Sequence, residues 1–369
     1  MIARALAPRL LVIPHCCGKT VNIAGVDLPL PRGQEAFCGG KNRAIGVPIA
    51  IPLCNQSRGT AKVNATAHQP PQIARANGIE LCYEIFGDAD AEPMLLIMGL
   101  AAQMIHWDDE FCRQLAARGF RVIRFDNRDI GKSSRMTGGK RLGAVELLKL
   151  RFLKIPVAAP YKLLDMAKDT IGLMDVLGIK SAHLVGASMG GMIAQEIAIS
   201  FPQRVRSLTS IMSTTGNPKV PGPTREASAM LMAPPPSTKE EYFERYAQTW
   251  KILRAGSFPQ DEALDRARAE RNFERGLNPA GVGRQLRAVL ASGNRKERLA
   301  SVKAPTLVIH GTFDPLVRPE GGKDTAASIP GAKLLMIEGM GHALPIPMWP
   351  QVIDAIDKHA HAASAKAMH

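Results

Sequence analysis

The sequence has few acidic and aromatic residues, and it lacks long apolar runs and cysteine pairs of the CxxC kind. Its 369 residues include 47 Lys and Arg against 33 Asp and Glu, and only 5% are aromatic. No apolar run approaches the roughly 18 residues of a membrane-spanning helix, so we predict no membrane span. The six cysteines have no CxxC pair and no zinc-ligand spacing. This excludes a small domain that is stabilised by disulfides or by bound zinc, and it favours the reducing cytoplasm as the location.

The formal net charge of +14 is concentrated near the N-terminus. Residues 1–70 carry eight Lys and Arg against two acids, a net charge of +6, and the remaining +8 is spread over the other residues. There it is interleaved with acids, as in the segment 265–271. No basic run is interleaved with base-stacking aromatics. We therefore predict a solvated basic surface and no nucleic-acid partner.

Residues 1–70 differ from the rest of the chain in composition and pattern. They are rich in Pro and Gly and lack sustained periodicity, which predicts a basic, disordered N-terminal extension. Over 71–213 and 297–369, apolar β-rich runs alternate with helical patterns. This predicts an α/β core in two parts, with a mostly parallel central sheet and helices on both faces. The predicted strands are 79–86, 94–98, 121–126, 182–187, 205–212, 305–310 and 332–337, and the clearest helices are 161–178 and 189–201.

The alternation breaks at 214–296, which predicts a helical lid inserted into the core. The segment opens with several prolines. Ser237 and Glu240 then form a capping-box pattern before an apolar helical stripe. A second, charged helix is predicted over 260–275 and ends at Gly276.

A Gly-x-Ser-x-Gly pattern at 186–190 carries the strongest chemical signal. An apolar strand leads into it and a helical pattern leads out, so Ser188 is expected in a tight strand-to-helix turn. Such a turn forces its central residue into a strained backbone state and requires neighbours without a Cβ atom. We therefore predict that Ser188 is a nucleophile whose hydroxyl stands above the edge of the sheet.

A serine nucleophile needs a base to take its proton, and the base needs a carboxylate to fix its tautomer. His342 follows the last predicted strand, and Asp314 lies just beyond the preceding one. The chain order Ser188, Asp314, His342 is the one expected for nucleophile, acid and base on such a sheet. His106 and His310 are interpreted as pocket or packing residues.

The reaction also needs N–H donors for a negatively charged oxygen. Met189, directly after the nucleophile, offers one, and the turn after an early strand offers Leu100 as the second. No metal or organic cofactor is required, and the Met-rich insertion favours a small apolar ester as the substrate. The predicted pocket residues are Gly99, Trp107, Met230 and Trp250.

Together these motifs resemble those of the α/β-hydrolase superfamily, particularly bacterial serine hydrolases similar to aclacinomycin methylesterase. The resemblance covers about residues 73–360 and rests on the stretches LLIMGL, RFDNRDIGKSS, APYKLLDMAKDTIGLMDVLGI, VGASMGGMIAQ, PTLVIHGTFDPLV and GMGHALP. It implies the α/β-hydrolase fold with an inserted lid, and cleavage of a carboxylic ester through an acyl-enzyme. The chain departs from many relatives at Met98, where they carry histidine, and at Asp129, where they carry glycine.

Other functions could use the same residues. An amidase, a C–C bond hydrolase or a cofactor-free haloperoxidase works with this kind of triad, and the sequence separates them poorly. A non-catalytic binding protein of the same fold is less favoured, because such proteins typically lose triad members. Serine at the elbow argues against dehalogenases and epoxide hydrolases, which resemble this fold but use a carboxylate nucleophile. The natural substrate and the oligomeric state are not predicted.

Overall fold

The computed structural model describes residues 68–139, 143, 146, 157–256, 258–259 and 261–367, together with the backbone of two short strands before them. The chain divides into two compact units, Met1–Thr60 and Ala61–His369. In the first unit, β1 (Thr20–Ile23) pairs antiparallel with β2 (Val26–Pro29). Most other residues of the predicted disordered extension lie outside the described residues.

The second unit is built around one eight-stranded sheet with the order β10-β9-β8-β7-β5-β6-β4-β3. Five neighbouring pairs are parallel, and β4 pairs antiparallel with both β3 and β6. The strands are β3 (His68–Ala76), β4 (Ile79–Phe86), β5 (Glu92–Ile97), β6 (Phe120–Phe125), β7 (Ala182–Ala187), β8 (Val205–Ile211), β9 (Thr306–Gly311) and β10 (Lys333–Ile337). All seven predicted strands are present, and the mostly parallel sheet is confirmed.

The edge strand β3 was not predicted. Its segment contains Pro70 and Pro71, and a proline pair argues against a strand except at the edge of a sheet, where N–H groups need no partner. β3 occupies that edge and pairs with β4. β3 begins at His68, so the strand extends across the predicted boundary at residue 70.

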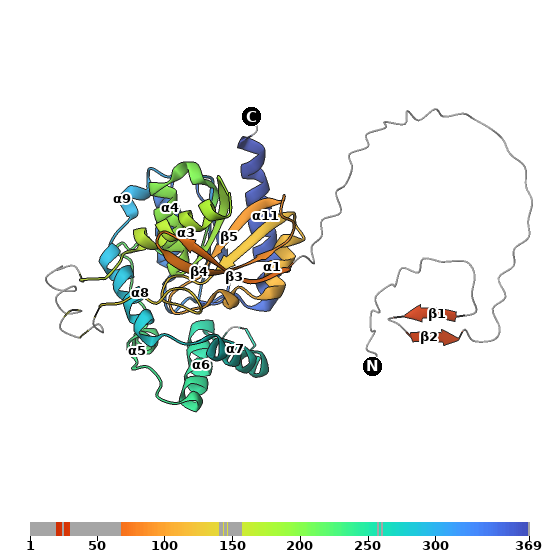
Figure 1. Cartoon of the computed structure of the whole chain (residues 1–369), viewed down its shortest axis with the longest axis horizontal. Coiled ribbons are helices and arrows are strands. Elements are labelled where there is room, and N and C mark those ends of the chain that lie inside the picture. The colour runs from red at the N-terminus through yellow and green to blue at the C-terminus, as the bar shows by residue number, and fades with distance from the viewer. Residues whose placement is uncertain are drawn as a thin grey trace, which may run out of the picture. The chain divides into compact units, whose positions relative to one another are not determined.

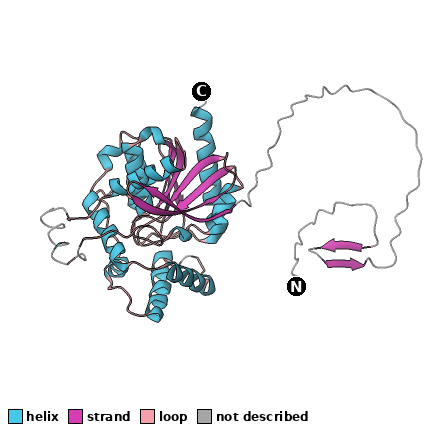
Figure 2. Ribbon diagram, in the orientation of Figure 1, coloured by secondary structure: helices cyan, strands magenta, loops and turns pink. Residues whose placement is uncertain are grey.

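Helices cover both faces of the sheet (Figures 1 and 2), as predicted. β5 alternates between two core clusters: Leu95 and Ile97 join the side chains of α3 and α4, while Met94 and Leu96 join those of α1 and α11. This period of two is what a strand buried on both faces produces. The helices of the core are α1 (Asp109–Ala116), α3 (Leu163–Val176), α4 (Met189–Ser200), α10 (Pro319–Ser328) and α11 (Trp349–Ala367).

The predicted helical insertion lies between β8 and β9. Figure 1 shows α5, α6 and α7 gathered on one side of the sheet, with α8 leading back to the core. Its helices are α5 (Arg225–Met232), α6 (Lys239–Arg254), α7 (Glu262–Arg275) and α8 (Pro279–Ser292), followed by the short α9 (Lys296–Leu299). Gly276 ends α7 as predicted. The predicted cap of α6 is wrong by one residue, because Thr238 rather than Ser237 accepts the N–H of Glu241.

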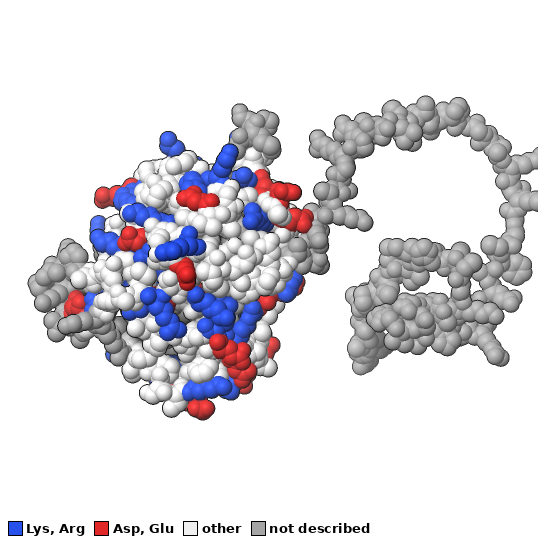
Figure 3. Space-filling model, viewed as in Figure 1, with Lys and Arg blue, Asp and Glu red and all other residues white. Residues whose placement is uncertain are grey.

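The surface and the cysteines of the described residues match the expectations from composition. None of the helices that the structure describes is long and apolar enough to cross a membrane. The described residues hold no group of three or more His, Cys, Asp or Glu side chains placed to bind a metal ion. Figure 3 shows basic and acidic side chains interspersed on the face drawn, as the interleaved sequence predicts. Cys82 and Cys112 are free and buried.

Candidate active site

Ser188 occupies the turn between β7 and α4. Its φ of 54° is in the left-handed region, which is uncommon for a residue with a side chain. The two motif glycines allow this turn, because a Cβ atom on Gly190 would lie 2.0 Å from the Ile97 carbonyl oxygen. A Cβ atom on Gly186 would lie 2.3 Å from the Gly190 carbonyl oxygen. The Gly-x-Ser-x-Gly pattern is therefore required by close packing of backbone, not by helix propensity.

His342 and Asp314 meet in the loops that follow β10 and β9. His342 Nδ1 lies 2.7 Å from Asp314 Oδ2. The other carboxylate oxygen, Oδ1, accepts the backbone N–H groups of Leu316 and Val317 at 2.9 and 2.8 Å. These bonds fix a fully buried carboxylate, and the carboxylate fixes the imidazole with its proton on Nδ1. His310 is packed inside β9, and its Nε2 donates to the Val317 carbonyl oxygen over 2.8 Å.

The backbone of His342 is held by the helical insertion. Its N–H donates to the carbonyl oxygen of Leu253, at the end of α6, over 2.6 Å. Gly341 allows this approach, because a Cβ atom there would lie 2.2 Å from the same oxygen. Arg254 next to it pairs with Asp265 of α7. The end of α6 is thereby fastened both to α7 and to the loop of the histidine.

The predicted oxyanion donors flank Ser188. Gly99 lies so close that a Cβ atom there would be 3.0 Å from the Cβ of Ser188. Leu100 follows it in the turn after β5 and lines the cavity described below. Met189 is the first residue of α4, so its N–H has no carbonyl partner within that helix. Met189 is thus adjacent to Ser188 along the chain, and Leu100 follows Gly99, which packs against Ser188.

A second set of contacts joins the insertion to the turn that carries Leu100. Gln285 of α8 is fully buried and accepts the N–H of Ala101 over 3.1 Å, and its amide nitrogen donates to the carbonyl oxygen of Arg128 over 2.9 Å. Ala101 has a φ of 63°. Gln285 therefore holds a strained turn in place next to Ser188.

Asp129 has a backbone conformation that is unusual for a residue with a side chain. Its φ of 73° is a conformation that suits glycine. Its buried carboxylate accepts hydrogen bonds from the Arg284 guanidinium at 2.7 and 2.9 Å and from the Tyr161 hydroxyl at 2.7 Å. Arg284 belongs to α8. The aspartate thus adds an ion pair between the insertion and the core that glycine could not form, and this offsets the backbone strain.

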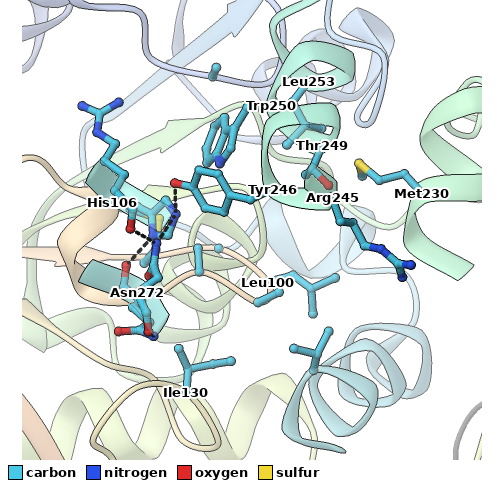
Figure 4. A pocket seen from close by; sticks show the side chains of 18 of the residues that line it. Leu100, His106, Ile130, Met230, Arg245, Tyr246, Thr249, Trp250, Leu253 and Asn272 are labelled. Carbon is cyan, nitrogen blue, oxygen red and sulfur yellow. Dashed lines mark hydrogen bonds between the residues drawn. The ribbon is translucent and has the colours of Figure 1, made fainter. Parts of the chain in front are cut away.

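A cavity of about 1400 Å³ lies between the insertion and the carboxyl ends of the strands. The predicted site residues that line it are Gly99, Leu100, Trp107, Ser188, Met230, Trp250 and His342. Figure 4 shows the side chains of α6 on one side and Leu100 and Ile130 on the other. Asp314 and Met189 lie beneath the surface, 0% and 1% exposed. Ser188 and His342 form no direct hydrogen bond among the described residues, and such bonds often tighten only when substrate binds.

The fold and this geometry agree with the comparison with known families. The sequence pattern of the α/β-hydrolase fold family matches residues 92–347. The chain belongs to the α/β-hydrolase fold family. This confirms the resemblance on which the sequence prediction depended.

The individual relatives of this hydrolase include a methylesterase and other hydrolases. It is 30% identical over 321 residues to a rhodomycin D methylesterase of Streptomyces sp. (strain C5), which covers 80% of this chain and 99% of that protein. It is 33% identical over 187 residues to a 2-hydroxy-6-oxononadienedioate/2-hydroxy-6-oxononatrienedioate hydrolase of Comamonas testosteroni, 48% of this chain and 61% of that protein. Its fold matches a meta-cleavage product hydrolase from Pseudomonas fluorescens IP01 with a TM-score of 0.62 at 20% identity, over 79% of this chain and 98% of that one.

The sequence analysis predicted Trp250 of α6 but missed Leu253 of the same helix and Arg284 and Gln285 of α8. Leu253 acts through its backbone, so no residue type marks it. Gln285 lies 184 residues from Ala101, its hydrogen-bond partner. For Asp129 a signal existed, since it departs from the family pattern, but its partner Arg284 lies 155 residues away. His106 was interpreted as a pocket or packing residue, and it does line the cavity.

Proposed function

We propose that this hydrolase cleaves carboxylic esters through an acyl-enzyme, with Ser188 as nucleophile, His342 as general base and Asp314 as its orienting carboxylate. The observation that carries the proposal is the 2.7 Å contact between His342 Nδ1 and Asp314 Oδ2, beside a cavity that Ser188 also lines. With Nδ1 bonded to the carboxylate, Nε2 is the ring nitrogen that can accept a proton. The 30% identity to a rhodomycin D methylesterase along nearly its whole length supports an ester as substrate.

In the first half of the reaction, His342 Nε2 takes the proton of Ser188 Oγ as the oxygen bonds to the ester carbonyl carbon. The carbonyl oxygen becomes negatively charged, and the N–H groups of Leu100 and Met189 are the proposed donors to it. The ester C–O bond then breaks. The departing alkoxide takes the proton from His342, which leaves an acyl group on Ser188 and a neutral imidazole.

In the second half, the same groups act on water. His342 takes a proton from a water molecule whose oxygen bonds to the acyl carbon, and the same N–H groups stabilise the charged oxygen. The bond to Ser188 Oγ breaks, and the serine recovers its proton from His342. A carboxylic acid leaves. Asp314 stabilises the imidazolium in both halves without itself becoming protonated.

The charges around the cavity favour an uncharged substrate. The basic side chains among the described lining residues are already engaged: Arg245 with Glu241, Arg254 with Asp265, Arg268 with Asp108, and Lys239 over the rings of Phe243 and Phe273. A relative named for a dienedioate acts on a dicarboxylate, which calls for free cations. This cavity suits the neutral ester of an apolar, ring-containing acid better.

The insertion at 214–296 acts in this proposal as the lid of the site. Its helix α6 contributes aromatic side chains to the wall of the cavity, among them Tyr246 and Trp250, and α5 contributes Met230. The contacts from Leu253 to His342 and from Gln285 to Ala101 tie it to the base and to the oxyanion turn. The lid therefore both shapes the substrate cavity and supports the reacting groups.

The proposal is tested with a panel of neutral methyl, aryl and lactone esters. For each acid, the panel also contains one matched amide and one matched vinylogous diketone. Rapid quenching followed by intact-protein mass measurement should find a species heavier by the acyl group during ester turnover. Esters should be cleaved much faster than their matched amides and diketones. Preferential cleavage of the diketone C–C bond would contradict the ester assignment, and ester turnover without any acyl species would contradict the mechanism.

A further inference from the structure

Three polar side chains meet at one place on the wall of the cavity (Figure 4). His106 ends the short 3₁₀ helix η1 (Met104–His106), Tyr246 lies on α6 and Asn272 lies on α7, and all three line the cavity. His106 Nε2 is 3.4 Å from the Tyr246 hydroxyl and 3.5 Å from Asn272 Nδ2. We refer to these three residues as the polar triplet. Its members come from the core and from two insertion helices.

The histidine of the triplet is an acceptor at its cavity-side nitrogen. His106 Nδ1 lies 3.1 Å from the Gln103 carbonyl oxygen, so Nδ1 carries the proton and Nε2 carries the lone pair. Burial lowers the pKa of His106 to about 4, which keeps the ring neutral at physiological pH. Both contacts to Nε2 are longer than the normal range for a hydrogen bond. Its lone pair is therefore poorly satisfied by the protein.

The amide of the triplet also lacks a donor. Asn272 is 3% exposed, and its Oδ1 is buried with no hydrogen-bond partner among the described residues. Its Nδ2 is engaged, since it donates to the Arg268 carbonyl oxygen over 3.0 Å. A buried acceptor without a partner is costly. The triplet thus offers acceptors short of a donor, together with the Tyr246 hydroxyl, which can donate to an incoming oxygen.

The surroundings define the shape of the group that fits. The Trp250 ring stacks against His106 with centroids 5.6 Å apart, which forms a flat wall beside the triplet. Leu253, whose carbonyl holds His342, lies seven residues beyond Tyr246 on the same helix, which is roughly 10 Å at 1.5 Å per residue. A ligand that extends along α6 from the triplet to the His342 loop therefore has the length of about two aromatic rings.

From this arrangement we propose that the polar triplet is a subsite for a hydroxyl group at the far end of a flat substrate whose ester lies at Ser188. The hydroxyl donates to His106 Nε2 or Asn272 Oδ1 and accepts from Tyr246. The orientation rests on the proposed ester hydrolysis, whereas the subsite itself requires only binding. His106, Tyr246 and Asn272 are specificity-determining residues in this proposal and take no part in bond cleavage.

Binding to the Ser188→Ala protein tests the subsite without turnover. The probes are methyl 4′-hydroxybiphenyl-4-carboxylate, its 4′-methoxy analogue and the unsubstituted methyl biphenyl-4-carboxylate, with dissociation constants measured by calorimetry. The hydroxyl compound should bind about tenfold tighter than the unsubstituted one, as expected for one well-placed hydrogen bond. The methoxy compound accepts but does not donate, so it should not regain this advantage.

Tyr246→Phe and His106→Phe, each added to Ser188→Ala, should remove most of the hydroxyl advantage and leave binding of the unsubstituted ester nearly unchanged. Tyr83→Phe is the matched control, because its hydroxyl bonds to Gln72 away from the cavity; there the advantage should persist. A hydroxyl compound that binds no tighter, or an advantage that survives both substitutions, would overturn the subsite. If the advantage appears but the unmodified protein cleaves none of the esters, the proposed reaction fails and the subsite stands.

Discussion

Among the residues that the structure describes, two groupings of serine, histidine and carboxylate can be compared, and they lie at opposite ends of the strands. Ser188, His342 and Asp314 follow the carboxyl ends of β7, β10 and β9. The other grouping lies near the amino ends of β8, β7 and β5: Ser207 Oγ is 2.8 Å from His183 Nδ1, and His183 Nε2 is 3.3 Å from Glu92 Oε2. Judged by hydrogen bonds alone, the second grouping is the more complete triad.

The difference lies in backbone geometry and access. Ser207 and His183 are directly opposite each other in the parallel ladder of β7 and β8 and are each 1% exposed. They form an ordinary cross-strand pair. Ser188 instead stands in a strained turn on the wall of a large cavity, with helix N-terminal N–H groups beside it. A hydroxyl can act as a nucleophile only where substrate and oxyanion donors can reach it. The hydrogen bonds of a serine by themselves do not reveal whether it is accessible in this way.

Substitution of each serine by alanine should give the largest difference between the two groupings. Ser188→Ala should lower kcat for a p-nitrophenyl ester by about 10⁶-fold if the subtilisin precedent applies. Ser207→Ala removes a hydroxyl that only pairs strands, so kcat should stay near that of the unmodified protein. Steady-state rates on both purified, folded variants check this. Equal loss in both variants would show that folding, not chemistry, explains the effect.

Neutralising each carboxylate gives the next largest contrast. In Asp314→Asn the amide oxygen should keep the N–H groups of Leu316 and Val317, so the amide nitrogen faces His342 Nδ1. This favours the wrong tautomer of the imidazole, and kcat should fall on the order of 10⁴-fold, as in the serine-protease case. Glu92→Gln alters a carboxylate that contacts His183 far from the cavity and should change kcat little. The pH–rate profiles of the two variants provide the measurement. A large catalytic defect in Glu92→Gln alone would contradict the assignment.

A smaller loss of kcat is expected when the contact between the Leu253 carbonyl oxygen and the His342 backbone N–H is disturbed. In Gly341→Ala the new Cβ would lie 2.2 Å from the Leu253 carbonyl oxygen, so the histidine loop must move. A displacement of about 1 Å costs roughly 100-fold in rate. Gly222→Ala is the control, since a Cβ there meets nothing within 4 Å. If kcat is unchanged in Gly341→Ala while melting temperature falls, the contact serves stability only.

The smallest expected effect is on the pH dependence of stability, and it comes from the buried His183 of the second grouping. Burial lowers the pKa of His183 to about 4, below the unfolded value near 6.5. Between these values the unfolded chain binds more protons, so the free energy of unfolding should fall as pH drops from about 6.5 to 4. His183→Gln should reduce this loss. Urea midpoints at pH 7 and pH 5 test it, and an identical loss in both proteins would contradict a neutral, buried His183.

Local patterns in the sequence were sufficient for most of the fold. The apolar strands and the Gly-x-Ser-x-Gly turn depend on residues within about ten positions of one another. What local pattern could not provide were contacts across the chain. The pair of Gln285 with Ala101 and that of Arg284 with Asp129 join residues more than 150 positions apart. The strand β3 was missed for a different reason, its proline pair.

The most direct measurement of the central claim is the identity of the serine that reacts. A fluorophosphonate probe, followed by proteolysis and peptide mass mapping, reports which hydroxyl is nucleophilic in the folded protein. The account predicts a single modification on Ser188, with Ser207 unmodified, and loss of ester turnover in proportion to labelling. Labelling of Ser207 or another serine, or full turnover after complete modification of Ser188, would contradict it.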